Sequence, residues 1–258
     1  MPQLKAVLFD LDDTLIDWSG FDGDYRQVEV PHFKGVRAYI EDAGHGSLLP
    51  TMDNMLMDFR DRAMAGWERG RETMISPHLP RILQEMLRGY GVPEDLLDEH
   101  MLMDHYAWDA VHGTTVFPEV PAVLETLLGA DVKISIVTNA FQTMRMRDRE
   151  LADHDLLRYF ETCRFAAADV GYLKPHPAIF EAALSCVDVA PENAVFVGDN
   201  LNADIVGAQR IGMKAVWRDT GYHSSRVARE VIHPDATVTA LDQMLPHLDT
   251  WFEGWRGA

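Results

Sequence analysis

The sequence predicts an α/β protein in which a doubly wound parallel sheet carries an inserted, all-helical domain. Three observations lead to this prediction. An apolar run, AVLF, lies near the N-terminus at residues 6–9. From about residue 117 onward, short β-rich runs alternate with helical stretches, as expected of a parallel sheet covered by helices. Between about residues 31 and 113 only helical patterns occur, which indicates a bundle inserted after the first strand.

The strands of the sheet are expected where β-rich apolar runs occur. The run at 6–9 is apolar on both faces, which is typical of a central strand buried between two layers of helices. Further strands are expected at 133–137, 194–198 and 213–217. Helices are expected between these strands, from Gln142 to His154 and from Asn202 to Gln209.

Four helices are expected in the insert, with proline at early helical positions and glycine after the ends. They are His32 to Ala43, Met52 to Arg71, Pro77 to Tyr90 and Pro93 to His112. Methionines and aromatic residues recur at helical spacing in this region, so we expect them to form the core of the bundle.

The segment that leads into the insert is unusually long, with some fifteen residues between Thr14 and the first expected helix. It carries Gly20 and Gly23 between possible extended runs, so it is expected to form a hairpin that hinges the insert. We expect its Trp18, Phe21, Tyr25 and Arg26 to pack beneath the insert, the alternative being that they reach the functional site.

Composition restricts the class of protein and its partners. The formal net charge is −18, from 41 acidic and 23 basic side chains, so DNA, other polyanions and anionic membranes are not expected as partners. Apolar runs are too short to span a bilayer, and we expect no signal peptide. Cys163 and Cys186 have neither metal-ligand spacing nor the numbers of a disulfide framework, so both are expected to be packing residues in a reducing compartment, the cytoplasm.

Two carboxylates follow the first strand. Asp10 and Asp12 lie two positions apart, so they share one face if the chain stays extended. One could attack an electrophile while the other moves protons. Carboxylates this close together repel one another, so a cation is expected beside them. The alternative is an acidic turn or helix cap, with Asp13 or Thr14 as the capping residue.

Polar residues follow the second expected strand and occupy a later loop. Thr138 and Asn139 end ISIV and offer a hydroxyl, an amide and backbone N–H groups that could bind an anion, although an N-cap is the favoured explanation when VTN is taken alone. Lys174, in GYLKPHP, could provide a fixed positive charge for phosphate. The alternative for Lys174 is a solvated surface lysine.

A third polar cluster follows the strand AVFVG. Asp199, Asn200 and Asp204 lie in GDNLNAD, and carboxylate and amide oxygens suit Mg²⁺. A turn that caps the next helix would explain Asp199 alone but not the whole set. Each polar cluster follows a β-rich run, so all are expected at one edge of the sheet, where open α/β sheets place their sites.

These motifs resemble those of the haloacid dehalogenase superfamily of phosphohydrolases. DLDDT, VTN, LKP and GDNLNAD match its four motifs in the same order. The resemblance covers residues 1–15 and 117–258 and implies a Rossmann-like catalytic core. Residues 16–116 match the family's helical cap domain, with its hinge, in placement and texture.

The resemblance implies a role for each motif residue. Asp10 would be the nucleophile that accepts the phosphoryl group, and Asp12 the acid/base. Thr138, Asn139 and Lys174 would bind phosphate. Mg²⁺ would be held by Asp10, the backbone carbonyl of Asp12 and Asp199, with Asn200 and Asp204 in or near its outer shell. The implied enzyme is a Mg²⁺-dependent phosphatase of a small phosphorylated metabolite, acting through an aspartyl phosphate as a monomer or homodimer.

Other activities stay open at this point. A phosphomutase of the β-phosphoglucomutase kind shares the cap and the motifs. Haloacid dehalogenases use the same nucleophile, but they lack an acid at the position of Asp12. A phosphorylatable receiver, or a catalytically silent phosphate-binding relative, would also cluster aspartates around Mg²⁺, but receivers are about half this length and carry no helical insert.

Overall fold

The computed structural model describes residues 2–221 and 226–257, and it contains the expected parallel sheet. All neighbouring strands of the six-stranded sheet run parallel. In spatial order the strands are β5 (Arg164–Ala166), β4 (Lys133–Thr138), β1 (Ala6–Phe9), β6 (Ala194–Gly198), β7 (Lys214–Arg218) and β8 (Ala236–Val238). The chain builds outward from β1 first on one side and then on the other. The sheet is therefore doubly wound, as predicted, although the short edge strands β5 and β8 were not expected.

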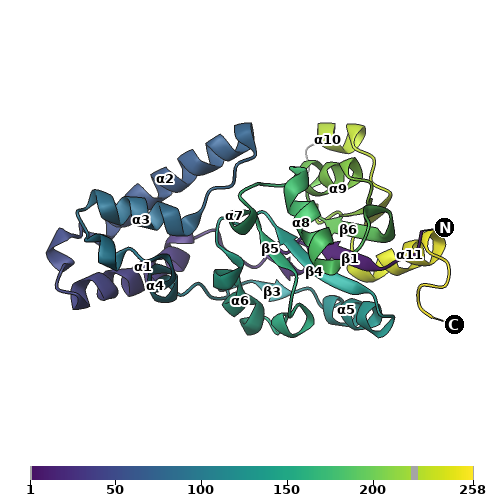
Figure 1. The fold of residues 1–258 in the computed structure, drawn as a ribbon, viewed down its shortest axis with the longest axis horizontal. Coiled ribbons are helices and arrows are strands. Elements are labelled where there is room, and N and C mark those ends of the chain that lie inside the picture. Colours follow the sequence, from purple (N-terminus) through teal and green to yellow (C-terminus); the bar gives the residue numbers. More distant parts are fainter. Residues whose placement is uncertain (1, 222–225, 258) are drawn as a thin grey trace.

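Helices cover both faces of the sheet (Figure 1). The core helices are α5 (Val120–Gly129), α6 (Met144–Asp153), α7 (Ala167–Val170), α8 (Pro177–Val187), α9 (Val206–Arg210), α10 (Arg226–Val231) and α11 (Leu245–Trp251). On one face, α5, α6 and α11 enclose one apolar cluster; on the other, α8 and α9 enclose a second. The alternating strand and helix pattern of the sequence thus gives three layers, the sheet and one layer of helices on each of its faces.

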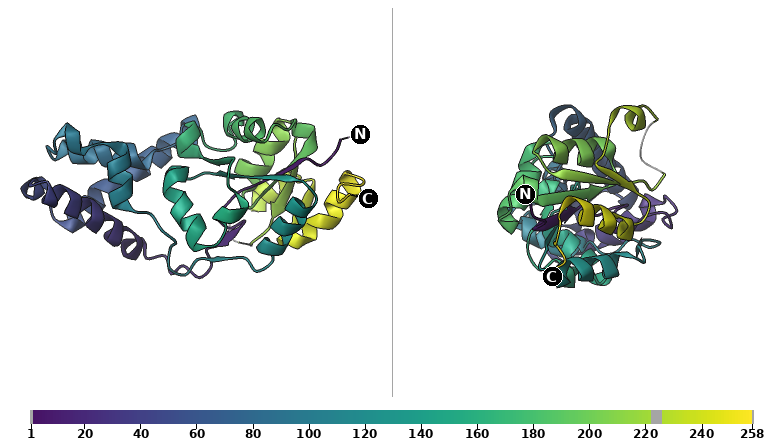
Figure 2. Two further views of the ribbon diagram at one scale, coloured as in Figure 1. Left: turned by 60° about the horizontal axis from the view of Figure 1, so that its bottom comes forward. Right: turned by 90° about the vertical axis from the view of Figure 1, so that its right-hand side faces the viewer.

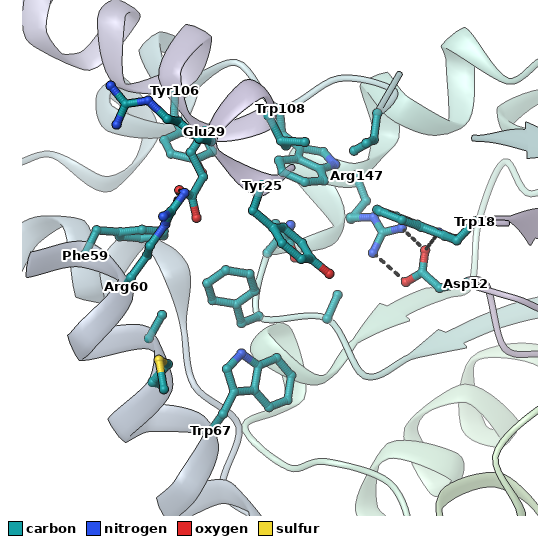
Figure 3. A pocket seen from close by; sticks show the side chains of 18 of the residues that line it. Asp12, Trp18, Tyr25, Glu29, Phe59, Arg60, Trp67, Tyr106, Trp108 and Arg147 are labelled. Atoms are coloured by element: carbon teal, nitrogen blue, oxygen red, sulfur yellow. Dashed lines mark hydrogen bonds and ion pairs between the residues drawn. The ribbon is translucent and has the colours of Figure 1, made fainter. Parts of the chain in front are cut away.

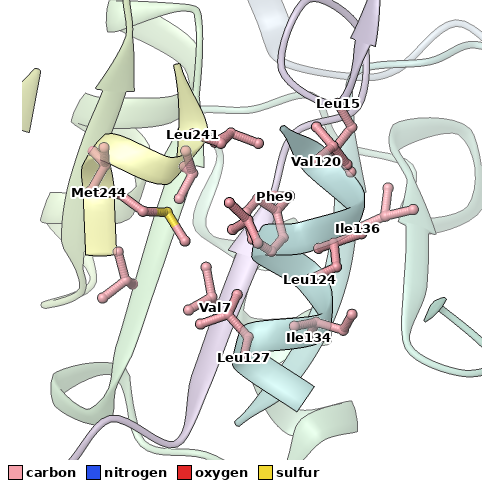
Figure 4. Packing of buried hydrophobic residues seen from close by; sticks show 14 of the residues in the cluster. Val7, Phe9, Leu15, Val120, Leu124, Leu127, Ile134, Ile136, Leu241 and Met244 are labelled. Carbon is pink, nitrogen blue, oxygen red and sulfur yellow. The ribbon is translucent and has the colours of Figure 1, made fainter. Parts of the chain in front are cut away.

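Strand β1 contributes to both clusters because successive side chains point to opposite faces. Val7 and Phe9 pack with Leu124 and Leu127 of α5 on one face (Figure 4). Ala6 and Leu8 belong to the cluster on the other face. All four β1 side chains are fully buried, which accounts for a strand that is apolar on both faces.

The insert is a bundle of four helices, α1 (Tyr25–Asp42), α2 (Met52–Thr73), α3 (Leu79–Gly89) and α4 (Glu99–Tyr106). It lies at one end of the elongated molecule, with the sheet and both chain ends at the other (Figures 1 and 2). The predicted bundle core is confirmed: its cluster includes Phe33, Met55, Phe59, Met103 and Tyr106. From here on, "cap" denotes this bundle.

Two helix boundaries of the cap were wrong. Helix α1 begins at Tyr25, where Asp24 caps it through a hydrogen bond from the Arg26 N–H, and it continues through Pro31. The linker before it is therefore shorter than expected. The helix expected over 93–112 is instead a 3₁₀ turn, Glu94–Leu96, followed by α4, which ends at Tyr106.

The expected hairpin in the linker is also wrong. Strand β2 (Ile16–Asp17) pairs antiparallel with β3 (Thr115–Val116), the segment that leaves the cap. The two connections then touch, since a Cβ added to Gly20 would lie 2.4 Å from the carbonyl oxygen of Gly113. The hinge thus consists of two chain segments held side by side rather than one segment folded on itself.

The cysteines form a disulfide between Cys163 and Cys186, so the expectation of two unpaired packing residues is wrong. Their separation of 23 residues matches no motif, which is why the sequence did not reveal the pairing. The cysteines consequently give no support to a reducing compartment. Among the residues described, no helix has both the length and the apolar character needed to cross a membrane.

Candidate active site at the carboxyl edge of the sheet

Three neighbouring strands deliver the predicted polar residues to one pocket. Asp10 and Asp12 follow β1, Thr138 ends β4, and Asp199 follows β6. Together with Asn139, Lys174, Asn200 and Asp204 they line a pocket of about 200 Å³. This edge is the switch point of the sheet, where the strand order reverses and open α/β proteins bind their ligands. All eight predicted site residues are brought together here.

Lys174 lies between two buried carboxylates. Its Nζ is 2.6 Å from Asp10 Oδ1 and 2.7 Å from Asp204 Oδ1. Burial alone would lower the pKa of Lys174, but the charges of Asp10 and Asp204 outweigh it and raise that pKa. Lys174 is therefore a fixed positive charge and not the solvated surface lysine of the alternative interpretation. It reaches this place from the loop after α7, not from the end of a strand.

Asp10, Asp199 and Asp204 form a group suited to a divalent cation. Each offers a carboxylate oxygen, and these atoms lie within 4.8 Å of one another. Burial raises the pKa of Asp10 to about 7, against the charge of Lys174. Burial, followed by the charges of Asp10 and Asp204, raises the pKa of Asp199 to about 9. A second positive charge is needed to keep these carboxylates ionised, and an oxygen-rich group at a buried site is what Mg²⁺ takes as ligands.

The turn after β6 explains how Asp204 reaches this group. The Asn200 side chain accepts hydrogen bonds from the N–H groups of Asn202 and Ala203, at 3.1 and 3.0 Å, and so caps the π-helical turn Leu201–Ile205. Asp204 Oδ2 accepts a hydrogen bond from the Asn200 N–H at 2.9 Å. A Cβ at Gly198 would lie 2.3 Å from Asp204 Oδ2, so only glycine leaves room for this carboxylate.

Thr138 and Asn139 do not cap the following helix. Helix α6 begins only at Met144, with Thr143 as its N-cap residue. The Asn139 side chain instead binds the backbone of Lys174, accepting from its N–H at 2.7 Å and donating to its carbonyl at 3.2 Å. The amide of Asn139 thus anchors the Lys174 loop, and the buried Thr138 lines the pocket beside it.

Asp12 points away from the carboxylate group and is bound by two residues that the sequence analysis did not assign to the site. Arg147 donates to both of its oxygens, at 2.8 and 3.0 Å, and Trp18 Nε1 donates to Oδ1 at 2.9 Å. Burial would raise the pKa of Asp12, but the Arg147 guanidinium beside it prevails and lowers that pKa. Trp18 therefore reaches the site, contrary to the expectation that it only packs beneath the cap.

Arg147 is itself held by buried partners. Glu150, one turn further along α6, is fully buried and accepts a hydrogen bond from Arg147 at 3.2 Å. Trp108, in the segment that leaves the cap, donates to the same carboxylate at 2.8 Å. Nothing in the spacing of MRMRDRE distinguishes Arg147 from its neighbouring arginines, because only the packing of α6 brings it to Asp12.

A larger pocket, of about 720 Å³, lies between the cap and the core and shares Asp12 and Asn139 with the smaller one. Figure 3 shows Asp12, Trp18 and Arg147 on one side of it and Glu29, Arg60 and Phe59 on the other. The site thus has two compartments that meet at Asp12. The smaller is charged, and the larger is walled mostly by apolar side chains of the cap and hinge.

The sequence was also compared with known proteins. A sequence model of the haloacid dehalogenase-like hydrolases matches residues 4–212. The glyceraldehyde 3-phosphate phosphatase of Pyrococcus furiosus is 28% identical over 266 residues, which cover 96% of this chain and 95% of that protein.

Two solved structures share the fold over nearly their whole lengths. The 2-haloacid dehalogenase of Pseudomonas syringae has 27% sequence identity and a TM-score of 0.62, with 96% of this chain and 99% of that one covered. A HAD-hydrolase of Bacillus subtilis, crystallised bound to magnesium, has 20% identity and a TM-score of 0.55, again with 96% and 99% covered.

Proposed function

The chain belongs to the haloacid dehalogenase-like hydrolases, and on that premise we propose that it is a Mg²⁺-dependent phosphatase of small phosphorylated metabolites. A phosphatase of this kind is already named among its relatives, the glyceraldehyde 3-phosphate phosphatase. The net charge of −18 disfavours nucleic acids as substrates. A cytoplasmic location and a monomeric or homodimeric state remain predictions.

The observation that carries this proposal is the position of Lys174 between Asp10 and Asp204, at 2.6 and 2.7 Å. A buried lysine fixed beside a carboxylate can neutralise a phosphoryl oxygen while it keeps that carboxylate oriented for attack. Thr138, at the end of the adjacent strand, adds a hydroxyl donor in the same pocket. Together they suit a phosphoryl group bound directly in front of Asp10.

In the first step, a carboxylate oxygen of Asp10 attacks phosphorus and the bond between phosphorus and the leaving-group oxygen breaks. Asp12 lies on the side that opens into the larger pocket, so it is placed to give a proton to that oxygen. The products of this step are an alcohol and an aspartyl phosphate on Asp10. Lys174 and Thr138 hold the phosphoryl oxygens throughout.

In the second step, water attacks the aspartyl phosphate and Asp12 takes its proton, which releases inorganic phosphate and restores Asp10. The proton taken from water restores the carboxyl form of Asp12, which gives a proton to the leaving group in the next turnover. Asp10, Asp199, Asp204 and the carbonyl of Asp12 are the proposed surroundings of Mg²⁺. When bound there, the ion would neutralise the charge gathered on the carboxylates and the phosphoryl group.

A second candidate is dehalogenation, because a solved 2-haloacid dehalogenase shares the fold at 27% identity. That reaction leaves a halide, which needs no proton, whereas phosphate-ester cleavage leaves an alkoxide that does. An acid/base residue at Asp12, held by three hydrogen bonds beside the leaving-group pocket, therefore favours phosphoryl transfer.

The test is a parallel assay of phosphate and halide release. We expect the purified chain to release phosphate from a panel of phosphorylated metabolites with Mg²⁺, and to release no chloride from 2-chloropropionate. Chloride release without phosphate release would replace the phosphatase proposal with a dehalogenase. Transfer of the phosphoryl group to a second sugar hydroxyl, with no free phosphate, would instead identify a phosphomutase.

A further inference from the structure

We propose that the leaving group of the substrate carries an uncharged, planar heteroaromatic ring, as in a nucleoside 5′-monophosphate. This inference rests on the proposed phosphatase function and narrows its substrate class. The larger pocket is the feature that supports it. That pocket opens from Asp12, on the side of the proposed proton donor, so its occupant is the leaving group and not the phosphoryl group.

Aromatic side chains are enriched in the walls of this pocket. Seven of its 21 lining residues are aromatic, whereas aromatic residues make up 9% of the chain. Phe141 lies with its ring centroid 6.3 Å from that of Phe59 and 5.9 Å from that of Trp67. Such surfaces favour a flat ring that can stack or meet them edge-on, and a three-carbon leaving group would leave most of them uncovered.

Tyr25 is the most solvent-exposed of the aromatic residues that line the pocket. It begins α1, its side chain is 59% exposed, and its ring extends into the centre of the pocket between the Asp12 side and the Glu29 side (Figure 3). The ring packs edge-on against Phe21, with ring centroids 5.0 Å apart, and its exposed part can lie against a bound planar group. Its exposure also means that its replacement should leave the cap core intact.

The charges of the pocket argue against an acidic leaving group. Three arginines line it, and each is already paired: Arg26 with Asp53 at 2.6 Å, Arg60 with Glu29 at 2.6 Å, and Arg147 with Asp12 at 2.8 Å. Among the described residues, no lysine or histidine lines the pocket. A carboxylate on the leaving group, as in a short phospho-acid, would have to compete with the carboxylates that already pair with these arginines.

Polar atoms at the far end from Asp12 suit the edge of a heteroaromatic ring. The Tyr106 side chain lines the pocket and is 1% exposed. Burial, with the charge of Glu29, raises the pKa of Tyr106, so the hydroxyl keeps its proton for donation. Glu29 Oε2 accepts a hydrogen bond from Arg60 Nε, which leaves Oε1 to accept a hydrogen bond from a ring N–H. Tyr106 and Glu29 thus offer the pocket a donor and an acceptor, which suit a ring that carries both kinds of group.

The experiment compares a nucleotide with a sugar phosphate that lacks its ring and with a short phospho-acid. With the full chain and Mg²⁺, kcat/KM is measured for uridine 5′-monophosphate, ribose 5-phosphate and phosphoglycolate. We expect the nucleotide to exceed both others by about tenfold or more, the order of one ring stacked on an aromatic side chain. Uridine, the product, should inhibit competitively at concentrations at which ribose does not.

Variants connect that preference to the pocket. Tyr25→Ala should lower the ratio of kcat/KM for the nucleotide to kcat/KM for ribose 5-phosphate by about threefold or more. Tyr25→Phe should retain most of this preference. Met57→Ala is the matched control, because Met57 lies on α2 outside the pocket and is 63% exposed. This variant should change kcat/KM for neither substrate.

The two proposals fail in different ways. A nucleotide to ribose 5-phosphate ratio near one, or preference for phosphoglycolate, overturns the ring inference while the phosphatase function stands. An unchanged ratio in Tyr25→Ala would equally contradict the assigned pocket. Absence of phosphate release from these three compounds and from the whole panel of phosphorylated metabolites overturns the proposed function and the inference with it.

Discussion

Arg147 of α6 donates two hydrogen bonds to the carboxylate of Asp12, 135 residues earlier in the chain. The guanidinium is almost completely buried and also contacts Glu150, whose side chain is inaccessible. One cation thus serves a buried structural carboxylate and the proposed acid/base at the same time. The orientation of Asp12 is consequently fixed by buried residues of the core and not by flexible surface side chains.

Removal of Arg147 should be costly to stability. In Arg147→Ala, Glu150 keeps only its hydrogen bond from Trp108 and becomes an uncompensated buried charge. We expect a loss of about 3–5 kcal/mol in the free energy of unfolding, measured by urea denaturation. Arg145→Ala is the control, because Arg145 pairs with Asp104 at the surface and its loss should cost about 1 kcal/mol or less. Equal losses in the two variants would refute the structural role of Arg147.

Asp10→Asn should abolish phosphate release. An amide is neither a nucleophile nor a good Mg²⁺ ligand, while Lys174 would keep its contact with Asp204 and the fold should survive. Asp155→Asn, at an exposed position, should be fully active. If Asp10→Asn kept more than about 1% of kcat, equivalent to a barrier increase below roughly 3 kcal/mol, Asp10 would not be the nucleophile.

Asp12→Asn should slow turnover by roughly 10²- to 10⁴-fold, the usual contribution of a positioned acid/base. With an activated aryl phosphate the first step needs little protonation, so the aspartyl phosphate should accumulate. Rapid acid quenching followed by mass spectrometry would detect it as a phosphorylated chain. Unchanged steady-state turnover would remove Asp12 from this role.

Mg²⁺ should both activate and stabilise the protein. A chelator should abolish phosphate release and added Mg²⁺ restore it, whereas Ca²⁺, with a larger and looser coordination sphere, should inhibit. At about 100 times its Kd, Mg²⁺ should add roughly 2.7 kcal/mol to the free energy of unfolding, visible as a rise in Tm. The rise should vanish in Asp199→Asn. Full activity in excess chelator would contradict the proposed metal site.

The disulfide should matter for stability and not for turnover. It closes a loop of 23 residues and lies beside Lys133 and Ile134, at the amino end of β4 and away from the site. Reduction with dithiothreitol should lower the free energy of unfolding by about 3 kcal/mol while phosphate release at 25 °C persists. The double variant Cys163→Ser, Cys186→Ser should show the same loss without reductant. A large fall in kcat on reduction would mean that the site depends on this bond.

The parts of the molecule that could be predicted from sequence are those governed by local rules. Asp10, Thr138 and Asp199 follow strands whose apolar runs are visible in the sequence, and parallel strands bring such residues to one edge. The start of α1 was missed because Pro31 suggested a boundary, although Asp24 offered a capping signal seven residues earlier.

The parts that could not be predicted depend on packing between distant segments. The Trp18 ring can be assigned to the core or to the site only when the position of Asp12 is known. Pairing of Cys163 with Cys186 requires that the segment before β5 lie against α8, which no spacing rule encodes. The antiparallel ladder between β2 and β3 joins segments on either side of the whole cap, so a local hairpin was the natural but incorrect interpretation.

The central place of β1 in the sheet has a consequence for the order of events during synthesis. Ala6 pairs with Lys133 on one side and with Ala194 on the other, and both partners emerge from the ribosome only after the cap is complete. The cap core, which apart from Met146 comes from residues 33–111, can therefore assemble while β1 is still without neighbours. We therefore expect folding to begin in the bundle that encloses the leaving-group pocket and to end around the strand that carries Asp10.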